Sequence, residues 1–190
     1  MIAGLSRRGY VKEEEVEEYT YGLNLFLTDA LNLISMVAVG FLMRMPLECI
    51  SFCLIYKLLR RYVGGFHTNS AVTCYISSCA TYIVALLAIK YGGSPDLFLS
   101  LAALGAGIIL FCIAPVDAVN KPLDNVERKV FKRRARLEII LILILCLGFL
   151  FTGFDYAAKV VAVSYLFVMI YAVMGKAKLM WHEKRKAIAV

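Results

Sequence analysis

The stretch "LEIILILILCLGFLFTGF", residues 137–154, decides the class of fold, because it is almost wholly apolar. The hydrocarbon core of a bilayer is about 30 Å thick, and a helix of about 18 or more apolar residues crosses it. Of the 190 residues, 61% are hydrophobic, whereas a soluble domain has about 45–50%. Mean hydropathy is +0.75. The sequence therefore predicts an integral membrane protein rather than a soluble domain with a large core.

Six apolar stretches are candidate membrane spans, and we expect each to be an α-helix because lipid offers no partner to open backbone groups. They cover residues 22–43, 46–59, 70–91, 97–114, 137–154 and 157–175. With no internal repeat visible, residues 1–190 are predicted to form one polytopic all-α domain. Residues 1–21 are polar where a cleavable signal peptide needs an apolar segment. They form either an interfacial N-terminal helix or a solvated lead-in.

Lysine and arginine gather in every second connection between these spans. Such an alternation sets the orientation of a membrane protein, with the basic connections in the cytoplasm. The net charge of +7 is therefore interpreted as a topology signal rather than a nucleic-acid surface. We expect both termini in the cytoplasm, together with the basic segments 1–21, 60–69, 115–136 and 175–190.

The segment "RRYVGGFHTNSAVTCY", residues 60–75, places reactive side chains between two apolar runs. A cysteine thiolate is a strong nucleophile, and histidine is the usual base that generates it. Cys74 lies in the first turns of the third span, where a helix N-terminus favours the thiolate. His67 and Cys74 are therefore candidates for a catalytic Cys–His dyad. The alternative is an ordinary histidine and cysteine at a membrane interface.

The spacing of the two residues constrains the loop between them. Seven residues along one helix separate two side chains by about 10 Å, too far for a hydrogen bond. The chain must therefore fold back before the third span, and Gly64 and Gly65 supply the backbone freedom. Asn69 or Ser70 is then expected to cap that span.

The other cysteines do not predict a disulfide framework or a zinc site. Five of them, Cys49, Cys53, Cys79, Cys112 and Cys146, sit in or beside apolar runs, where a thiol behaves as a small hydrophobe. Cys79 competes weakly with Cys74 as a nucleophile. We predict no metal and no cofactor. His182 is read as a solvated interfacial residue of the basic tail.

Asp29 is the acidic residue that stands out, because it lies inside the first span. An intramembrane carboxylate is costly and is a functional candidate by default. Asp29 is a candidate to orient His67, as the third member of a triad does. Helix packing through a polar cluster is the alternative.

Residues 60–78 resemble the catalytic stretch of the accessory gene regulator B family (AgrB). The matching positions are Arg60, Arg61, Gly65, His67, Cys74 and Ser78. The segment "APVDAVNKPLDNVERKVFKRRAR", residues 114–136, resembles that family's basic loop, including the step Lys121–Pro122. These two segments, with the length and the number of spans, extend the resemblance over essentially the whole chain.

The resemblance implies a bacterial cell-membrane cysteine peptidase, active at the cytoplasmic face, that processes a quorum-sensing propeptide. Cys74 would cleave off the C-terminal part through a thioester, and an internal cysteine or serine of the substrate would then close a thiolactone or lactone ring. The implied substrate is small, with an amphipathic leader and an acidic C-terminal part. Ser78 would belong to the catalytic loop.

The implied substrate-binding residues are Arg60, Arg61, Lys121, Pro122, Lys129 and Arg133. For the residues of the basic loop, contact with lipid headgroups is an alternative. Other partners are membrane lipids and a second copy of the chain in a homodimer. The small residues Ala103, Gly105 and Gly107 permit such close helix packing. The alternative function is a non-enzymatic transporter or exporter of a small peptide, which would not require the dyad.

Overall fold

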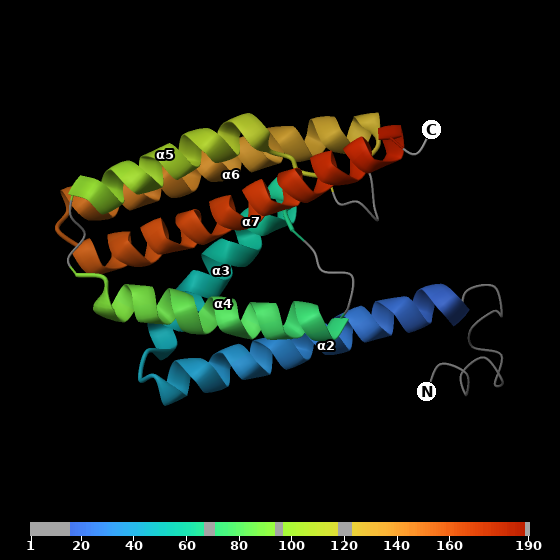
Figure 1. Cartoon of the computed structure of the whole chain (residues 1–190). Coiled ribbons are helices and arrows are strands. Elements are labelled where there is room, and N and C mark those ends of the chain that lie inside the picture. The colour runs from blue at the N-terminus through green and yellow to red at the C-terminus, as the bar shows by residue number, and fades with distance from the viewer. Residues whose placement is uncertain (1–15, 67–70, 94–96, 118–122, 189–190) are drawn as a thin grey trace.

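The computed structural model describes residues 16–66, 71–93, 97–117 and 123–188. The regular elements within them are all α-helices (Figure 1). The helices are α2 (Val16–Leu42), α3 (Pro46–Val63), α4 (Ala71–Tyr91), α5 (Leu97–Ile113), α6 (Asn125–Phe151) and α7 (Asp155–Ile188). The prediction of an all-α chain is confirmed for this part of the sequence, and each apolar stretch lies within, or within three residues of, one of these helices.

Successive helices run in alternate directions, so that their ends gather at two ends of the molecule (Figure 1). One end holds the starts of α2, α4 and α6 and the last residues of α3, α5 and α7. We call it the basic end, because the described lysines and arginines gather at the end of α3, at the start of α6 and at the end of α7. The opposite end holds the connections after α2, α4 and α6. The alternation of charge along the sequence thus matches an alternation of position in the fold.

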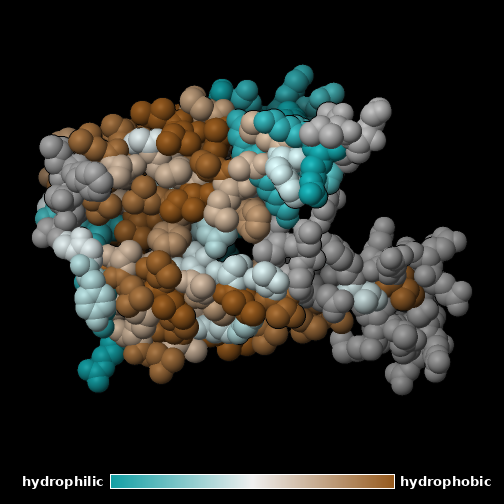
Figure 2. Space-filling model, in the orientation of Figure 1, coloured by the Kyte–Doolittle hydropathy of each residue, from teal (hydrophilic) through white to brown (hydrophobic). Residues whose placement is uncertain are grey.

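Two described helical segments, Val72–Tyr91 and Asp155–Arg185, are long and apolar enough to cross a membrane, and Phe26–Leu42 and Leu99–Ile113 are shorter apolar helices. Large apolar side chains also cover much of the outer surface (Figure 2). Leu42 and Phe151, for example, are 84% and 89% exposed. Water-soluble monomers rarely expose apolar patches of this extent, which supports association with a membrane.

Four predicted boundaries differ from the structure, because polar residues extend the helices beyond the apolar runs. Helix α2 begins at Val16, so residues 16–21 continue into the first span rather than forming a separate interfacial helix. Helix α3 continues to Val63, and the predicted loop 60–69 therefore begins as helix. The predicted tail 175–190 is helical to Ile188, as part of α7.

The fourth difference concerns the predicted basic loop 115–136, because its second half belongs to α6. The Asp124 carboxylate accepts hydrogen bonds from the amides of Val126 and Glu127, each at 2.7 Å. The Glu127 carboxylate accepts a bond from the Asp124 amide at 3.3 Å, which completes a capping box. Such a box satisfies amides that have no partner within the helix. Helix α6 therefore starts before the apolar run, and its first turns carry the basic residues.

The core lies where α3 and α7 cross the other helices. Its largest fully buried side chains include Tyr165, Phe52 and Leu59. Lys159, near the start of the sixth predicted span, is only 4% exposed and donates a hydrogen bond from Nζ to the Gly93 carbonyl at 2.5 Å. Two of the three small residues of α5 pack within the chain, since Ala103 is buried and Gly107 faces the Tyr165 ring. A Cβ atom at Gly105 would meet no atom within 4 Å.

Candidate active site

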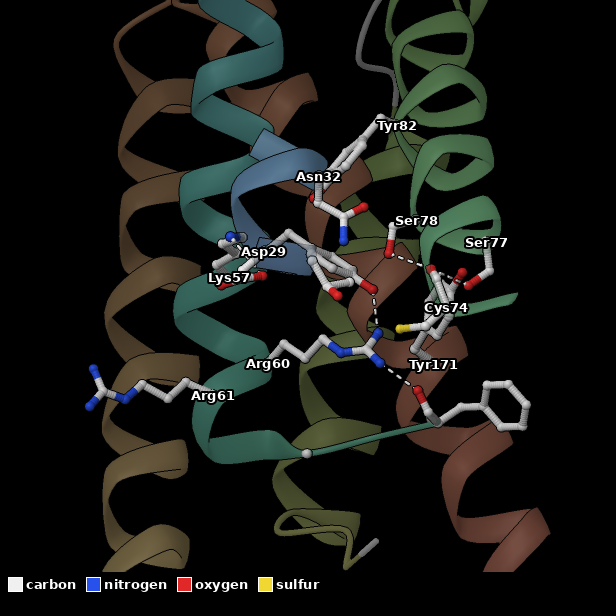
Figure 3. A pocket seen from close by; sticks show the side chains of 14 residues that line it. Asp29, Asn32, Lys57, Arg60, Arg61, Cys74, Ser77, Ser78, Tyr82 and Tyr171 are labelled. Carbon is white, nitrogen blue, oxygen red and sulfur yellow. Dashed lines mark hydrogen bonds and ion pairs between the residues drawn. The ribbon is translucent and has the colours of Figure 1, made fainter. Parts of the chain in front are cut away.

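A cavity of about 500 Å³ lies between α2, α3, α4 and α7 and contains Cys74. Its lining is mostly polar or aromatic: Thr28, Asp29, Asn32, Tyr56, Lys57, Arg60, Arg61, Gly64, Phe66, Cys74, Ser77, Ser78, Tyr82 and Tyr171 (Figure 3). Lys57, Arg60 and Arg61 outnumber Asp29 among these residues, so the cavity carries a net positive charge. Such a cavity suits a polar substrate with a reactive carbonyl group.

Cys74 lies in the first turns of α4, near the basic end of the molecule (Figure 1). Its Sγ atom points into the cavity, on the side where the Arg60 guanidinium lies (Figure 3). The hydroxyls of Ser77 and Ser78 donate hydrogen bonds to the Cys74 carbonyl at 3.0 and 2.9 Å. Ser78, predicted to belong to the catalytic loop, therefore lines the cavity but binds the helix backbone rather than the thiol.

Arg60 is fixed in the middle of the cavity by contacts on several sides. Its guanidinium donates hydrogen bonds to the Tyr56 hydroxyl and to the Phe66 carbonyl. The same group lies 5.5 Å from the centre of the Tyr56 ring and 4.8 Å from that of Tyr171, where a cation–π attraction is expected. The Tyr171 hydroxyl is in turn 2.5 Å from Thr81 Oγ1. The positive charge beside Cys74 is therefore held in one place.

The chain leaves the axis of α3 at Gly64 and Gly65, the two glycines that the sequence predicts to supply backbone freedom. Both have positive φ, 76° and 143°, a region that glycine adopts without steric cost. The turn is held by hydrogen bonds from the Phe66 amide to the Tyr171 carbonyl and from the Val116 amide to the Val63 carbonyl, at 2.9 and 2.8 Å. Helix α3 therefore ends at Val63, and the predicted fold-back at His67 lies outside the described residues.

Gly175 of α7 is a positioning residue of this turn that the sequence did not reveal. A Cβ atom at Gly175 would lie 2.5 Å from the carbonyl carbon of Gly65 and 2.7 Å from the Phe66 nitrogen. These neighbours are backbone atoms, so α7 approaches the turn this closely only because residue 175 has no side chain. In the sequence it looked only like the end of the last apolar run.

Asp29 lines the same cavity as Cys74, but its side chain is 68% exposed and lies 3.4 Å from the ammonium of Lys57. The neighbouring Asn32 differs, because it is only 7% exposed and its Oδ1 atom has no hydrogen-bond partner within the described residues. Both belong to α2 (Figure 3).

The predicted residues His67, Asn69, Lys121 and Pro122 lie outside the described residues. The pairing of His67 with Cys74 or Asp29 therefore stays a prediction. Arg61 is exposed, and its guanidinium lies 5.5 Å from the Tyr62 ring centre; in Figure 3 it points away from Cys74.

Lys129 and Arg133 line a different groove, of about 420 Å³, on α6 and the end of α5. It shares no lining residue with the Cys74 cavity. Its other members are Phe111, Lys132, Arg136, Leu137 and Ile140.

The other cysteines are packed differently from Cys74. Cys49, Cys53 and Cys146 are buried, and Cys79 is half-buried, outside the lining of the cavity. Cys112 is exposed. Within the described part of the chain, no group of three or more histidine, cysteine, aspartate or glutamate side chains is arranged to hold a metal ion.

The chain is similar to several named bacterial proteins. A putative AgrB-like protein of Clostridium perfringens (strain SM101) is 29% identical over 136 residues, covering 68% of this chain and 64% of that protein. The accessory gene regulator protein B of Staphylococcus aureus (strain MRSA252) is 25% identical over 153 residues, which cover 80% of each chain. A putative AgrB-like protein of Listeria monocytogenes (strain EGD-e) is 25% identical over 132 residues. No solved structure matches the chain.

The match to the Clostridium relative spans less than two thirds of that protein's length. The family comparison covers more of the chain, because the sequence model described as accessory gene regulator B matches residues 1–174. That range includes Cys74 and the other residues that line the cavity. The chain therefore belongs to the accessory gene regulator B (AgrB) family.

Proposed function

We propose that this protein is a membrane-embedded cysteine endopeptidase that matures a small quorum-sensing propeptide. The observation that carries the proposal is the placement of Cys74, whose Sγ atom points into a positively charged cavity beside the fixed guanidinium of Arg60. Membership of the AgrB family supports the same function. A channel-like transporter would not require a nucleophile held in this way.

In the proposed first step, the Cys74 thiolate attacks the carbonyl carbon of the scissile peptide bond. His67 has taken the thiol proton and returns it to the leaving nitrogen, as a base that becomes an acid does. The C-terminal part of the propeptide departs with a new amino group. The N-terminal part stays bound to Cys74 as a thioester.

In the second step, an internal thiol of the substrate attacks the thioester carbonyl and releases Cys74. One thioester replaces another, so the ring closes with little change in free energy; an internal hydroxyl would give a lactone instead. The step requires that water be kept from the thioester, which a site within a membrane helps to provide.

Arg60 has a clear role in this mechanism. Two of the five N–H groups of a guanidinium are used by Tyr56 and Phe66, which leaves others for substrate. A fixed cation stabilises the thiolate before attack and the oxyanion that develops on the carbonyl oxygen during it. We assign both roles to Arg60.

The proposal includes a placement in the membrane. Six helices cross the cell membrane, the basic end of the molecule faces the cytoplasm, and Cys74 works near that face. The alternation of basic segments supports this orientation through the positive-inside rule. The groove of Lys129 and Arg133 would bind the acidic part of the propeptide, and a homodimer stays part of the proposal.

Coexpression with the small propeptide encoded beside the gene tests the function. We expect the wild type to cut the propeptide, and both Cys74→Ala and His67→Ala to lose cutting while still inserting in the membrane. Cys79→Ala, on the same helix but outside the cavity, is the matched control and should retain it. Cutting by the Cys74→Ala variant would refute the mechanism, and export of an uncut peptide by that variant would favour a transporter.

A further inference from the structure

Asn32 is the polar side chain in the cavity whose hydrogen bonding is incomplete. It is 93% buried, since its exposed fraction is 7%, and its Oδ1 atom has no partner within the described residues. Leaving a buried amide oxygen without a partner destabilises the folded state, because the oxygen has lost its bonds to water and gained none in return. Buried groups of this kind require an explanation, and a missing ligand is one. The side chain points into the cavity that contains Cys74 (Figure 3).

The packing of α2 against α4 holds Asn32 beside the first turns of α4, which carry Cys74 and Ser78 (Figure 3). Ser35 lies three residues after Asn32, on the same face of α2. Its hydroxyl is 2.6 Å from the Tyr75 hydroxyl, and Tyr75 follows Cys74 directly in α4. This hydrogen bond ties the part of α2 that carries Asn32 to the part of α4 that carries the nucleophile.

A primary amide carries an acceptor oxygen and two N–H donors. A main-chain peptide group carries the complementary pair, one N–H and one carbonyl. Charged ligands are a poorer match, because Asn32 has no charge and Arg60 already supplies the cation of the cavity. The chemistry of Asn32 therefore suits the backbone of an extended peptide.

We propose that Asn32 binds a main-chain peptide group of the substrate directly next to the scissile bond. It is a positioning residue, distinct in role from Arg60, which acts on the carbonyl under attack. Held at Asn32 on one side and at Arg60 on the other, the scissile carbonyl is presented to Cys74. Recognition through the main chain makes this contact independent of the substrate's side chains. The inference rests on the proposed function, because it requires a peptide substrate.

The test pairs a variant of the protein with a variant of the substrate, using the full chain in liposomes. Asn32→Leu keeps the number and branching of the side-chain heavy atoms and removes the hydrogen bonds. In the propeptide, an ester replaces in turn each of the two peptide groups that flank the scissile bond. We expect Asn32→Leu to lower kcat/KM for the unaltered propeptide about 10- to 100-fold, as the loss of a buried hydrogen-bond partner does.

At one of the two positions, the ester should reduce kcat/KM for the wild type by a similar factor, but cause no further loss in Asn32→Leu. If, at both positions, the loss of kcat/KM caused by the ester multiplies with the loss caused by Asn32→Leu, then Asn32 acts elsewhere and the inference is overturned. Alkylation of Cys74 by iodoacetamide, which needs no peptide contact, should proceed within about twofold of the wild-type rate in Asn32→Leu. A larger change would reveal a damaged site and would also contradict the assigned role.

The same experiment separates the two proposals. If the propeptide acylates wild-type Cys74, but the effects of the ester and of Asn32→Leu on kcat/KM multiply at both positions, the inference about Asn32 fails and the proposed function stands. If Cys74 is never acylated, both fail.

Discussion

At the scale of single residues, the cavity combines side chains that chemistry identifies in a sequence with others that only packing identifies. Cys74, Gly64 and Gly65 were recognisable because a nucleophile and a glycine turn have distinct requirements. The sequence could also have identified Tyr56 as a neighbour of Arg60, because Tyr56 lies four residues before Arg60 on the same helix face. The sequence could not have identified Asn32 and Tyr171 as neighbours of Arg60, since these two residues come from helices distant in sequence.

Arg60 gives the sharpest prediction at this scale. Arg60→Lys keeps the charge but loses the planar fork that reaches both Tyr56 and Phe66. We expect kcat for propeptide cleavage to fall about 100-fold, the size of effect seen when an oxyanion donor is removed, and alkylation of Cys74 to slow as well. Lys90→Gln, at the far end of α4, is the control. Cleavage by Arg60→Lys within twofold of wild type would remove Arg60 from the mechanism.

At the scale of elements, the apolar runs located each helix that the structure describes but misplaced several ends. Hydropathy reports where a helix enters lipid, and it carries no information about where the helix stops in water. The polar extensions need other signals. For α6 the signal was present, as "DNVE" at residues 124–127 is a capping box. For the polar extension of α3 from Arg60 to Val63, the signal was Gly64, which follows directly, because glycine commonly ends a helix.

The close approach of α7 to the turn after α3 leads to a second prediction. In Gly175→Ala, the new methyl group would overlap the backbone of Gly65 and Phe66. We expect the free energy of unfolding in detergent to fall by about 1–3 kcal/mol, as overpacking does. Propeptide cleavage should fall at least about tenfold, because the turn leads to His67 and small displacements of reacting groups are costly.

Gly148→Ala is the matched control for that variant. Gly148 also lies within a helix, but a Cβ atom there would meet no atom within 4 Å. Alanine should stabilise this helix slightly, by about 0.5–1 kcal/mol. Equal stability and cleavage in the Gly175→Ala and Gly148→Ala variants would show that the close contact is unimportant.

At the scale of the whole molecule, the charge pattern of the sequence agrees with the arrangement of the helices. The described basic residues of α3, α6 and α7 share one end of the helices (Figure 1), although the sequence gives only their order. Lys159 is a cation near the opposite end, in the first turns of α7, and its ammonium is buried against the Gly93 carbonyl. Which helices pack together was beyond the sequence, because apolar runs of similar composition do not specify their neighbours.

Helix α7 provides a test of the orientation. It has 34 residues, a length of about 51 Å, so both ends should leave a hydrocarbon core of about 30 Å. In a chain whose native cysteines are replaced by alanine, Asp155→Cys should react with an impermeant maleimide outside intact cells. Lys184→Cys should react only after permeabilisation. Labelling of both from the same side would refute a membrane-crossing α7.

The central claim is that Cys74 carries the substrate as a thioester. The most direct measurement is the intact mass of the protein after a brief incubation with its propeptide and quenching in acid. We predict an added mass equal to the acyl group of the N-terminal part of the propeptide, which is the mass of the free fragment less one water, removable by hydroxylamine and mapped to Cys74. It should appear in Cys79→Ala and be absent from Cys74→Ala. Cleaved propeptide without any adduct on Cys74, or an adduct that persists in Cys74→Ala, would contradict the account.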